Sequence, residues 1–163
     1  MNEEDINILA HNFCFPWSTM QETQEKWTKY YAEQQSHIRL VGVVTKRDQL
    51  IGYGSLLLDS NYPYFKEENI PEIHDIWIDK NSRRSGCGKK LITYLEDLAR
   101  HAGYKYIGLG VGLYSDYGPA QKLYVQLQYV PDGNGVTYKD LPVTPGEKYP
   151  VDDELILWME KAL

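Results

Sequence analysis

Apolar residues near the N-terminus recur every three or four positions, which is the spacing of an amphipathic helix. The positions that show this are Ile6, Leu9, Ala10 and Phe13. Asn2 and the acidic residues after it suit a helix start, and Pro16 suits its end. A second run, from Ser18 to Tyr31, lacks glycine and proline, and Gln21 follows Ser18 at the spacing of a capping box. Two helices are therefore predicted.

The middle of the chain changes to runs of β-branched and aromatic residues, which are typical of strands. Residues 37–44 and 50–58 flank a polar stretch at 46–49 and are predicted to form a hairpin. A loop with two prolines follows at 59–71. Residues 72–79 then form a further predicted strand.

Helical and strand-like runs alternate in the second half of the chain. Helices are predicted at 88–102 and from Pro119 to about 127, and a strand at 106–111 lies between them. Two more strands are predicted at 136–138 and 155–158.

The order of these elements predicts a mixed α+β fold with helices on the faces of one sheet. The strand at 72–79, the helix after it and the strand at 106–111 should form a right-handed parallel crossover. No repeat, low-complexity tract or linker interrupts the pattern, so residues 1–163 are interpreted as one domain.

Composition limits the classes of function. The 163 residues include 17 Lys and Arg against 23 Asp and Glu, a net charge of −6. This balance argues against general nucleic-acid binding and suits a cationic substrate such as an amine. No window approaches the ~20 apolar residues of a membrane span, and the acidic N-terminus is unlike a signal peptide, so a cytoplasmic protein is expected. Cys14 and Cys87 are the only cysteines, which excludes a disulfide framework.

One turn reverses the acidic character of the chain. Between the strand at 72–79 and the helix at 88–102, five of the 17 basic residues gather in eleven positions: Lys80, Arg83, Arg84, Lys89 and Lys90. Two glycines lie among them, at Gly86 and Gly88. A helix N-terminus presents unpaired N–H groups and partial positive charge, and glycines allow a ligand to approach the backbone. The turn therefore predicts a phosphate site.

The spacing of the turn excludes two common phosphate loops. A Walker A loop would need Gly where Arg83 stands and Ser or Thr where Lys90 stands. A dinucleotide fingerprint would need a third Gly where Leu91 stands, and too little alternating β/α chain precedes it.

The run Arg83-x-x-Gly86-x-Gly88, after a strand and opening a helix, resembles the acyl-CoA loop of the GCN5-related N-acetyltransferase (GNAT) superfamily. The strand Glu72-Ile73-x-Asp75-Ile76-x-Ile78 is similar to the family's fourth strand, whose splayed, bulged backbone receives the pantetheine arm. Ala120-Gln121-Lys122-Leu123-Tyr124, followed by Tyr129, resembles the family's Ala-x-x-Leu-Tyr helix and the aromatic residue after it. Tyr117 and Gln128 stand where the family often has Asn and Gly. The resemblance covers nearly the whole chain.

The resemblance implies a GNAT-like acyl-CoA N-acyltransferase fold, with a mostly antiparallel central sheet and one parallel splay between the family's fourth and fifth strands. It implies acetyl-CoA as co-substrate. The residues implied to contact CoA are Ile76, Trp77, Ile78, Arg83, Arg84, Ser85, Gly86, Cys87, Gly88, Lys89, Tyr117 and Ala120. The four histidines show no ligand spacing with one another or with cysteine, so no metal is expected.

Acetylation of an amine by acetyl-CoA needs a base, because an alkyl ammonium with a pKa of about 10.4 must first lose a proton. Glu72 and Asp75 are the candidates. Three residues apart on a regular strand, they face opposite sides unless a bulge intervenes, so the choice between them stays open. Tyr124 matches the family's helix tyrosine and is the candidate that protonates or orients the leaving thiolate. Backbone N–H groups near Ile76 to Ile78 are candidates to stabilise the oxyanion.

The sequence thus predicts an acyltransferase that moves an acetyl group from acetyl-CoA to a primary amine by direct transfer in a ternary complex. The acceptor is a small-molecule or peptide amine that the sequence does not identify. By the resemblance, aromatic residues such as Phe15 and Trp17, the pair Asp152-Asp153 and the loop 59–71 border the acceptor cleft. The alternative is a CoA-binding sensor or scaffold without transfer. No nucleic-acid or membrane partner is expected, and an exposed last strand at 155–158 leaves a homodimer open.

Overall fold

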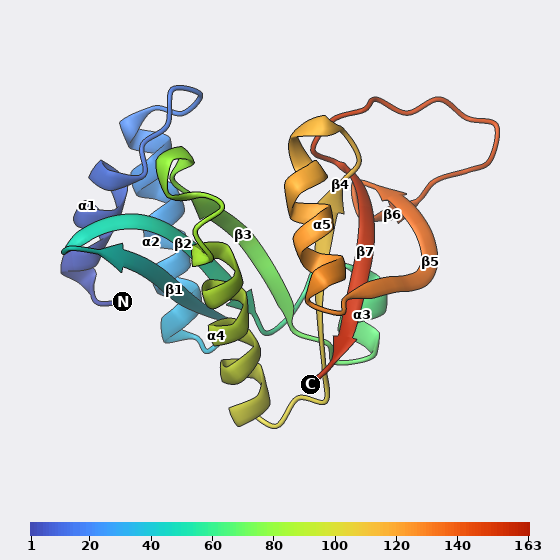
Figure 1. Cartoon of the computed structure of the whole chain (residues 1–163), viewed down its shortest axis with the longest axis horizontal. Coiled ribbons are helices and arrows are strands. Elements are labelled where there is room, and N and C mark those ends of the chain that lie inside the picture. The colour runs from blue at the N-terminus through green and yellow to red at the C-terminus, as the bar shows by residue number, and fades with distance from the viewer.

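In the computed structural model, which describes residues 1–163, the chain forms a seven-stranded sheet with helices on both faces (Figure 1). The helices are α1 (Glu3–Asn12), α2 (Met20–Gln35), α3 (Pro63–Glu67), α4 (Cys87–His101) and α5 (Gly118–Gln126), with 3-10 turns η1 (Lys80–Ser82) and η2 (Ser115–Tyr117). The strands are β1 (Arg39–Lys46), β2 (Gln49–Leu57), β3 (Glu72–Ile78), β4 (Tyr106–Gly112), β5 (Val130–Tyr138), β6 (Leu141–Pro142) and β7 (Leu155–Ala162). None of the helices has the length and apolar character that crossing a membrane requires.

The sheet order β1-β2-β3-β4-β7-β5-β6 confirms the predicted mixed α+β fold. All neighbouring strands are antiparallel except β3 and β4, which form the predicted parallel crossover around α4. These are the third and fourth strands of this chain, not the fourth and fifth, because only the β1–β2 hairpin precedes them. The expectation of an exposed last strand is wrong, since β7 lies inside the sheet between β4 and β5.

The two N-terminal helices form as predicted, with one difference at the start of α2. Asn2 and Asp5 make the capping box of α1. The box of α2 is formed by Thr19 and Glu22, one position after the predicted pair. Glu22 accepts from the Thr19 backbone N–H at 2.7 Å, and a carboxylate is favoured over an amide at the positive end of a helix. Ser18 Oγ lies 3.1 Å from Thr23 Oγ1 instead.

Four elements differ from the sequence prediction: α3 and β6 were not predicted, and β5 and β7 are longer than the predicted strands at 136–138 and 155–158. The loop at 59–71 contains α3, whose Phe65 is fully buried against Gly108 and Trp158. β5 begins at Val130, although only 136–138 is predicted as strand. Its pairing with β7 is interrupted between Pro131 and Val136, which explains why the stretch lacks a strand pattern.

Separate apolar clusters pack the helices against the two faces of the sheet. The largest joins α4 and α5 to one face, with Leu95, Ile107 and Leu109 at most 1% exposed. A second cluster, around Trp27 and Tyr53, holds α1 and α2 to the opposite face. The helices therefore fix the strands from both sides.

β3 and β4 share only two register pairs, Glu72 with Gly108 and Ile73 with Leu109. Figure 1 shows the two strands running apart from this common beginning, with α4 packed on the half that contains β3 and α5 on the half that contains β4. We refer to this divergence as the splay. It leaves the rest of β3 without a strand partner on that side.

The close packing of Phe65 on β4 gives a test of the fold. A Cβ atom at Gly108 would lie 2.2 Å from the Phe65 ring, so Gly108→Ala should lower the free energy of unfolding by about 1–3 kcal/mol. Gly118→Ala is the matched control, because no atom lies within 4 Å of the added Cβ atom. Urea unfolding measures both variants. Equal effects at the two positions would contradict the packing described here.

Candidate active site

The splay exposes backbone groups in the middle of the sheet. Beyond Ile73, the edge of β3 that faces β4 has no strand partner, and backbone N–H and C=O groups there need another partner or water. The start of α4 approaches α5 at the C-terminal end of β3. A Cβ atom on Gly88 would lie 3.6 Å from the Leu123 side chain and 4.0 Å from that of Ile78. A strand edge, a helix start and α5 therefore converge at one place.

The predicted phosphate turn lies at the end of β3. Arg84 and Gly86 both have positive φ angles, 57° and 85°, which fold residues 83–88 back into the start of α4. The Arg83 Nε donates to the Ile78 carbonyl oxygen at 2.8 Å, so this side chain ties the turn to β3. No side chain caps the first N–H groups of α4. These groups, together with the exposed Arg84 and Lys89, suit an anion such as a phosphate.

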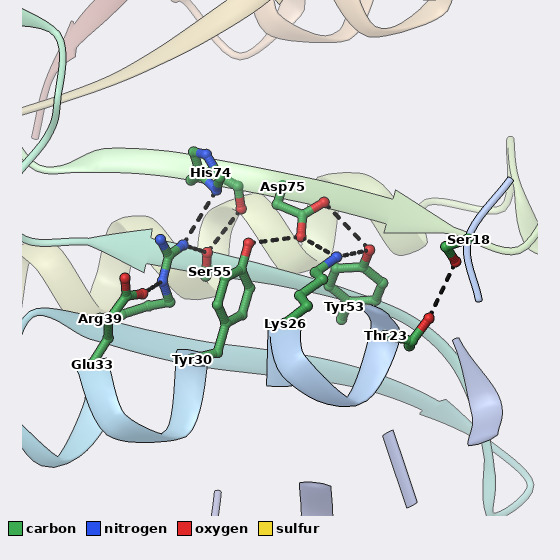
Figure 2. A network of polar contacts seen from close by, with 10 residues as sticks. All are labelled: Ser18, Thr23, Lys26, Tyr30, Glu33, Arg39, Tyr53, Ser55, His74 and Asp75. Carbon is green, nitrogen blue, oxygen red and sulfur yellow. Dashed lines mark hydrogen bonds and ion pairs between the residues drawn. The ribbon is translucent and has the colours of Figure 1, made fainter. Parts of the chain in front are cut away.

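β3 contains a bulge at Asp75 that the sequence left as an open question. Tyr53 pairs with Trp77 and Ser55 with His74, so two residues of β3 lie opposite Gly54 alone. Asp75 has a φ of 54°, in the left-handed region. The bulge turns its carboxylate toward α2, the side to which His74 also points (Figure 2). Glu72 shares that side with His74 because side chains alternate along a regular strand.

The two carboxylates have different surroundings. Glu72 is only 6% exposed and accepts a hydrogen bond from Ser60 Oγ at 2.6 Å. Burial raises the pKa of Glu72 to about 7, with the Ser60 bond acting in the opposite direction and Asp140 adding to the rise. Asp75 instead accepts from Lys26 Nζ. A carboxyl with a pKa near neutrality is suited to general base catalysis, whereas an ion-paired one is less available.

Asp75 lies at the centre of a polar network that Figure 2 shows. It accepts from Lys26 Nζ at 2.6 Å, from Tyr30 Oη at 2.9 Å and from Tyr53 Oη at 3.3 Å. Lys26 and Tyr30 belong to α2 and Tyr53 to β2. Sequence reasoning missed all three partners, since each also fits an ordinary core or solvated position.

A second part of the network holds His74 neutral. Arg39 Nη1 donates to His74 Nδ1 at 3.2 Å and to Ser55 Oγ at 2.6 Å, and Arg39 Nε pairs with Glu33 at 2.5 Å. Burial, with Arg39 beside it, lowers the pKa of His74 to about 4. Because arginine can only donate, Nδ1 is the acceptor and the ring proton lies on Nε2.

The α5 candidates line the other side of the splay. Tyr124 is 9% exposed, and burial raises its pKa to about 12, so its hydroxyl keeps its proton at neutral pH. The Tyr117 ring covers Gly112, where a Cβ atom would lie 2.4 Å away. Tyr117 Oη donates to Asp153 Oδ1 at 2.9 Å, and Tyr114 Oη donates to the same atom. These bonds fasten the loop before β7 to the start of α5.

The remaining predicted residues divide between the two sides of β3. Ile76 and Ile78 pack toward α4. Trp77 packs its ring against Phe13, Phe15 and Tyr53 on the opposite face, so only its backbone belongs to the splay.

The residues expected to border the acceptor cleft lie outside β3. Phe15 stacks on Trp17, which is 73% exposed at the α1–α2 turn. The pair Asp152-Asp153 is bonded to tyrosine hydroxyls, Asp152 to Tyr138 at 3.1 Å.

Comparisons with known proteins agree with this architecture. Residues 6–129 match the model of the acetyltransferase (GNAT) family. Comparison with the sequences of curated proteins gives no match.

The backbone is similar to those of several solved acetyltransferases. A ribosomal-protein-alanine N-acetyltransferase from Brucella melitensis has a TM-score of 0.66 and 18% identity, covering 100% of this chain and 97% of that one. An N-acetyltransferase from Staphylococcus aureus Mu50 has a TM-score of 0.67 and 19% identity, covering 99% of this chain and 94% of that one. An aminoglycoside 6'-N-acetyltransferase complexed with coenzyme A has a TM-score of 0.64 and 17% identity, covering 99% of this chain and 92% of that one. At these identities the likeness shows the fold.

The burial of Glu72 predicts a specific dependence of stability on pH. Its pKa is near 4.5 in the unfolded chain and about 7 in the folded one, so the folded state binds more protons between these values. The contribution of Glu72 to stability should therefore fall as pH rises from 4.5 to 7, by up to about 3 kcal/mol, whereas the lowered pKa of His74 makes an opposite contribution between about 4 and 6.5. Glu72→Gln, which keeps an acceptor for Ser60, should remove this component.

Urea unfolding at pH 5 and pH 8 measures the effect. Between pH 5 and pH 8 the free energy of unfolding should change less favourably in the unaltered chain than in Glu72→Gln, because both proteins share the contribution of His74 and only the first has that of Glu72. Glu67→Gln, at an exposed position, should behave like the unaltered chain. Equal changes in all three proteins would show that Glu72 titrates as an ordinary exposed carboxyl.

Proposed function

Because the chain belongs to the acetyltransferase (GNAT) family, we propose that it transfers an acetyl group from acetyl-CoA to a primary amine by direct transfer in a ternary complex. The observation that carries this proposal is the splay of β3 from β4 after Ile73, with the basic turn at one end and Glu72 at the other. The splay offers unpaired backbone for a ligand arm, and its ends offer an anion site and a base.

Acetyl-CoA fits the groups that the splay presents. The first N–H groups of α4, with Arg84 and Lys89, would hold the pyrophosphate. The backbone groups of residues 76–78 that face away from β2 would hydrogen-bond the pantetheine amides, as an added strand would. Ala120 and Tyr117, at the start of α5, would border the arm on its other side. Ser85, Gly86, Cys87 and Gly88 form the turn itself.

Glu72 is the proposed general base, acting directly or through a water molecule. The acceptor ammonium first gives a proton to the Glu72 carboxylate, which releases it to solvent. The neutral nitrogen then forms a bond to the acetyl carbon, and as the carbon–sulfur bond breaks, the nitrogen gives its second proton to Glu72. Backbone N–H groups of residues 76–78 would stabilise the oxyanion. Asp75, the other candidate, accepts three hydrogen bonds or ion pairs already and is assigned a different role below.

Tyr124 is the proposed donor to the departing thiolate. Its hydroxyl is protonated at neutral pH, since burial raises its pKa to about 12, and it comes from the α5 side of the splay. The proton that Tyr124 gives returns from solvent or from the base after transfer. The base and the donor then lie on opposite sides of the reacting carbon.

The acceptor is proposed to be a small-molecule or peptide amine. Similar structures include enzymes named for aminoglycosides and for the alanine of a ribosomal protein, and both names describe acetylation of amines. The acidic balance of this chain, −6, favours a cationic acceptor.

Substitution of the two proposed catalytic residues tests the reaction. Tyr124→Phe and Glu72→Gln should each lower kcat by about 100-fold or more in a thiol-release assay, because each removes a proton-transfer group. The affinity for acetyl-CoA should stay nearly unchanged, which calorimetry measures. Tyr94→Phe, at an exposed position on α4, is the control. Binding of acetyl-CoA without any acetylation of an amine panel would instead support a CoA-binding module.

Removal of basic side chains from the turn tests the proposed phosphate site. The double variant Arg84→Gln/Lys89→Gln should raise the Kd of acetyl-CoA about thirtyfold, since two exposed charges contribute about 1 kcal/mol each. Lys46→Gln/Arg47→Gln removes two basic residues from the β1–β2 turn and should leave Kd unchanged. Similar Kd values for the two double variants would place the phosphates elsewhere.

A further inference from the structure

The Lys26 ammonium lies in a site with the character of a receptor for alkylammonium ions. Its Nζ is 2.6 Å from Asp75 Oδ2 and donates to Tyr53 Oη at 2.8 Å. It also lies 4.6, 5.3 and 5.5 Å from the ring centroids of Tyr53, Trp27 and Tyr30. A carboxylate surrounded by aromatic faces is a general means of binding ammonium groups. We call Trp27, Tyr30, Tyr53 and Asp75 the ammonium cage.

The cage is held in place by contacts that do not involve Lys26. Tyr30 and Tyr53 are 6% and 2% exposed, and Trp27 is fully buried. Both tyrosine hydroxyls donate to Asp75, at 2.9 and 3.3 Å, and so orient its carboxylate. The bulge at Asp75 aims this carboxylate at α2 instead of the opposite face. The cage is therefore expected to persist when the ammonium leaves.

Lys26 itself is free to leave. Its side chain is 32% exposed and that of Asp75 is 27% exposed, so the cage borders solvent. The lysine stem is flexible, and its ammonium is strongly hydrated in water. Figure 2 shows the side chain extending from α2 toward Asp75.

The cage lies close to the proposed base. Asp75 follows Glu72 by three residues on the same strand, a separation of about 10 Å along an extended chain. The bulge places both carboxylates on the side of β3 that faces away from α4. A linear acceptor with its reacting nitrogen at Glu72 could therefore place a second ammonium group at Asp75.

We propose that the ammonium cage binds a second alkylammonium group of the acceptor, and that Lys26 occupies the cage until such an acceptor displaces it. In this exchange the ammonium of the acceptor donates to the groups to which Lys26 donated, and the Lys26 ammonium regains its hydration in water. Lys26 thereby weakens binding of dications relative to monoamines. This inference rests on the proposed function and specifies the acceptor as an amine with two positive charges.

Lys26→Met tests the proposal, because methionine keeps much of the stem and removes the charge. The KM for 1,6-diaminohexane should fall about tenfold, while the KM for n-hexylamine changes less than twofold. Lys29→Met, on the same helix at a side chain 71% exposed, is the matched control and should change neither KM. Lys26→Gln provides a second variant, with the same expected direction, if Lys26→Met folds poorly. Equal changes in KM for the two amines would overturn the proposal.

A binding measurement without acetyl-CoA separates the cage from the reaction. 1,6-Diaminohexane should raise the Tm of Lys26→Met and have a smaller effect on the double variant Lys26→Met/Asp75→Asn. Equal shifts in both variants would show that the diamine does not use the cage. Failure of the unaltered chain to acetylate any amine would overturn the proposed function, and the Tm comparison would still decide whether the cage binds ammonium.

Discussion

The two halves of the sheet are joined through β3 and β4, which pair at only two positions before they diverge. The apolar cluster beneath α4 and α5 holds both halves together, so the strands stay apart without separating the fold. The splay leaves backbone unpaired in the middle of a packed sheet, where a ligand arm can act as the missing strand. It also brings the start of α4, the side of α5 and the first residue of β3 to one site.

Positive and negative charges lie in different parts of this site. The turn at 83–89, the proposed site for the phosphates of acetyl-CoA, is basic, although the chain as a whole carries a net charge of −6. On the other side of β3, buried and half-buried carboxylates accept from neutral hydroxyls, as Glu72 does from Ser60 and Asp75 from Tyr30. Hydroxyl donors orient a carboxylate without neutralising it. These carboxylates therefore keep their attraction for a cationic acceptor, and Asp75 is the one that already has a cation, Lys26.

Periodicity and motif spacing predicted the strands around the splay, the parallel crossover and the turn at 83–88, because each depends on local pattern. The five-residue helix α3 was missed, since it depends on the tertiary contact of Phe65 with Gly108 and Trp158. The capping box was displaced by one residue, because Ser18 and Thr19 have equally suitable partners in sequence. The bulge at Asp75 depends on the register with β2, and the role of Lys26 depends on the bulge. The resemblance implied a bulged strand at 72–78 without giving the position of the bulge, and nothing in the sequence indicated the role of Lys26.

A crystal structure of the chain with CoA would show whether the splay binds the cofactor. We expect the pantetheine arm in the splay, hydrogen-bonded to the β3 backbone at residues 76–78, with the pyrophosphate at the first N–H groups of α4 and the sulfur near Tyr124. Binding of CoA at another surface, or β3 and β4 paired along their full length in the complex, would contradict this expectation.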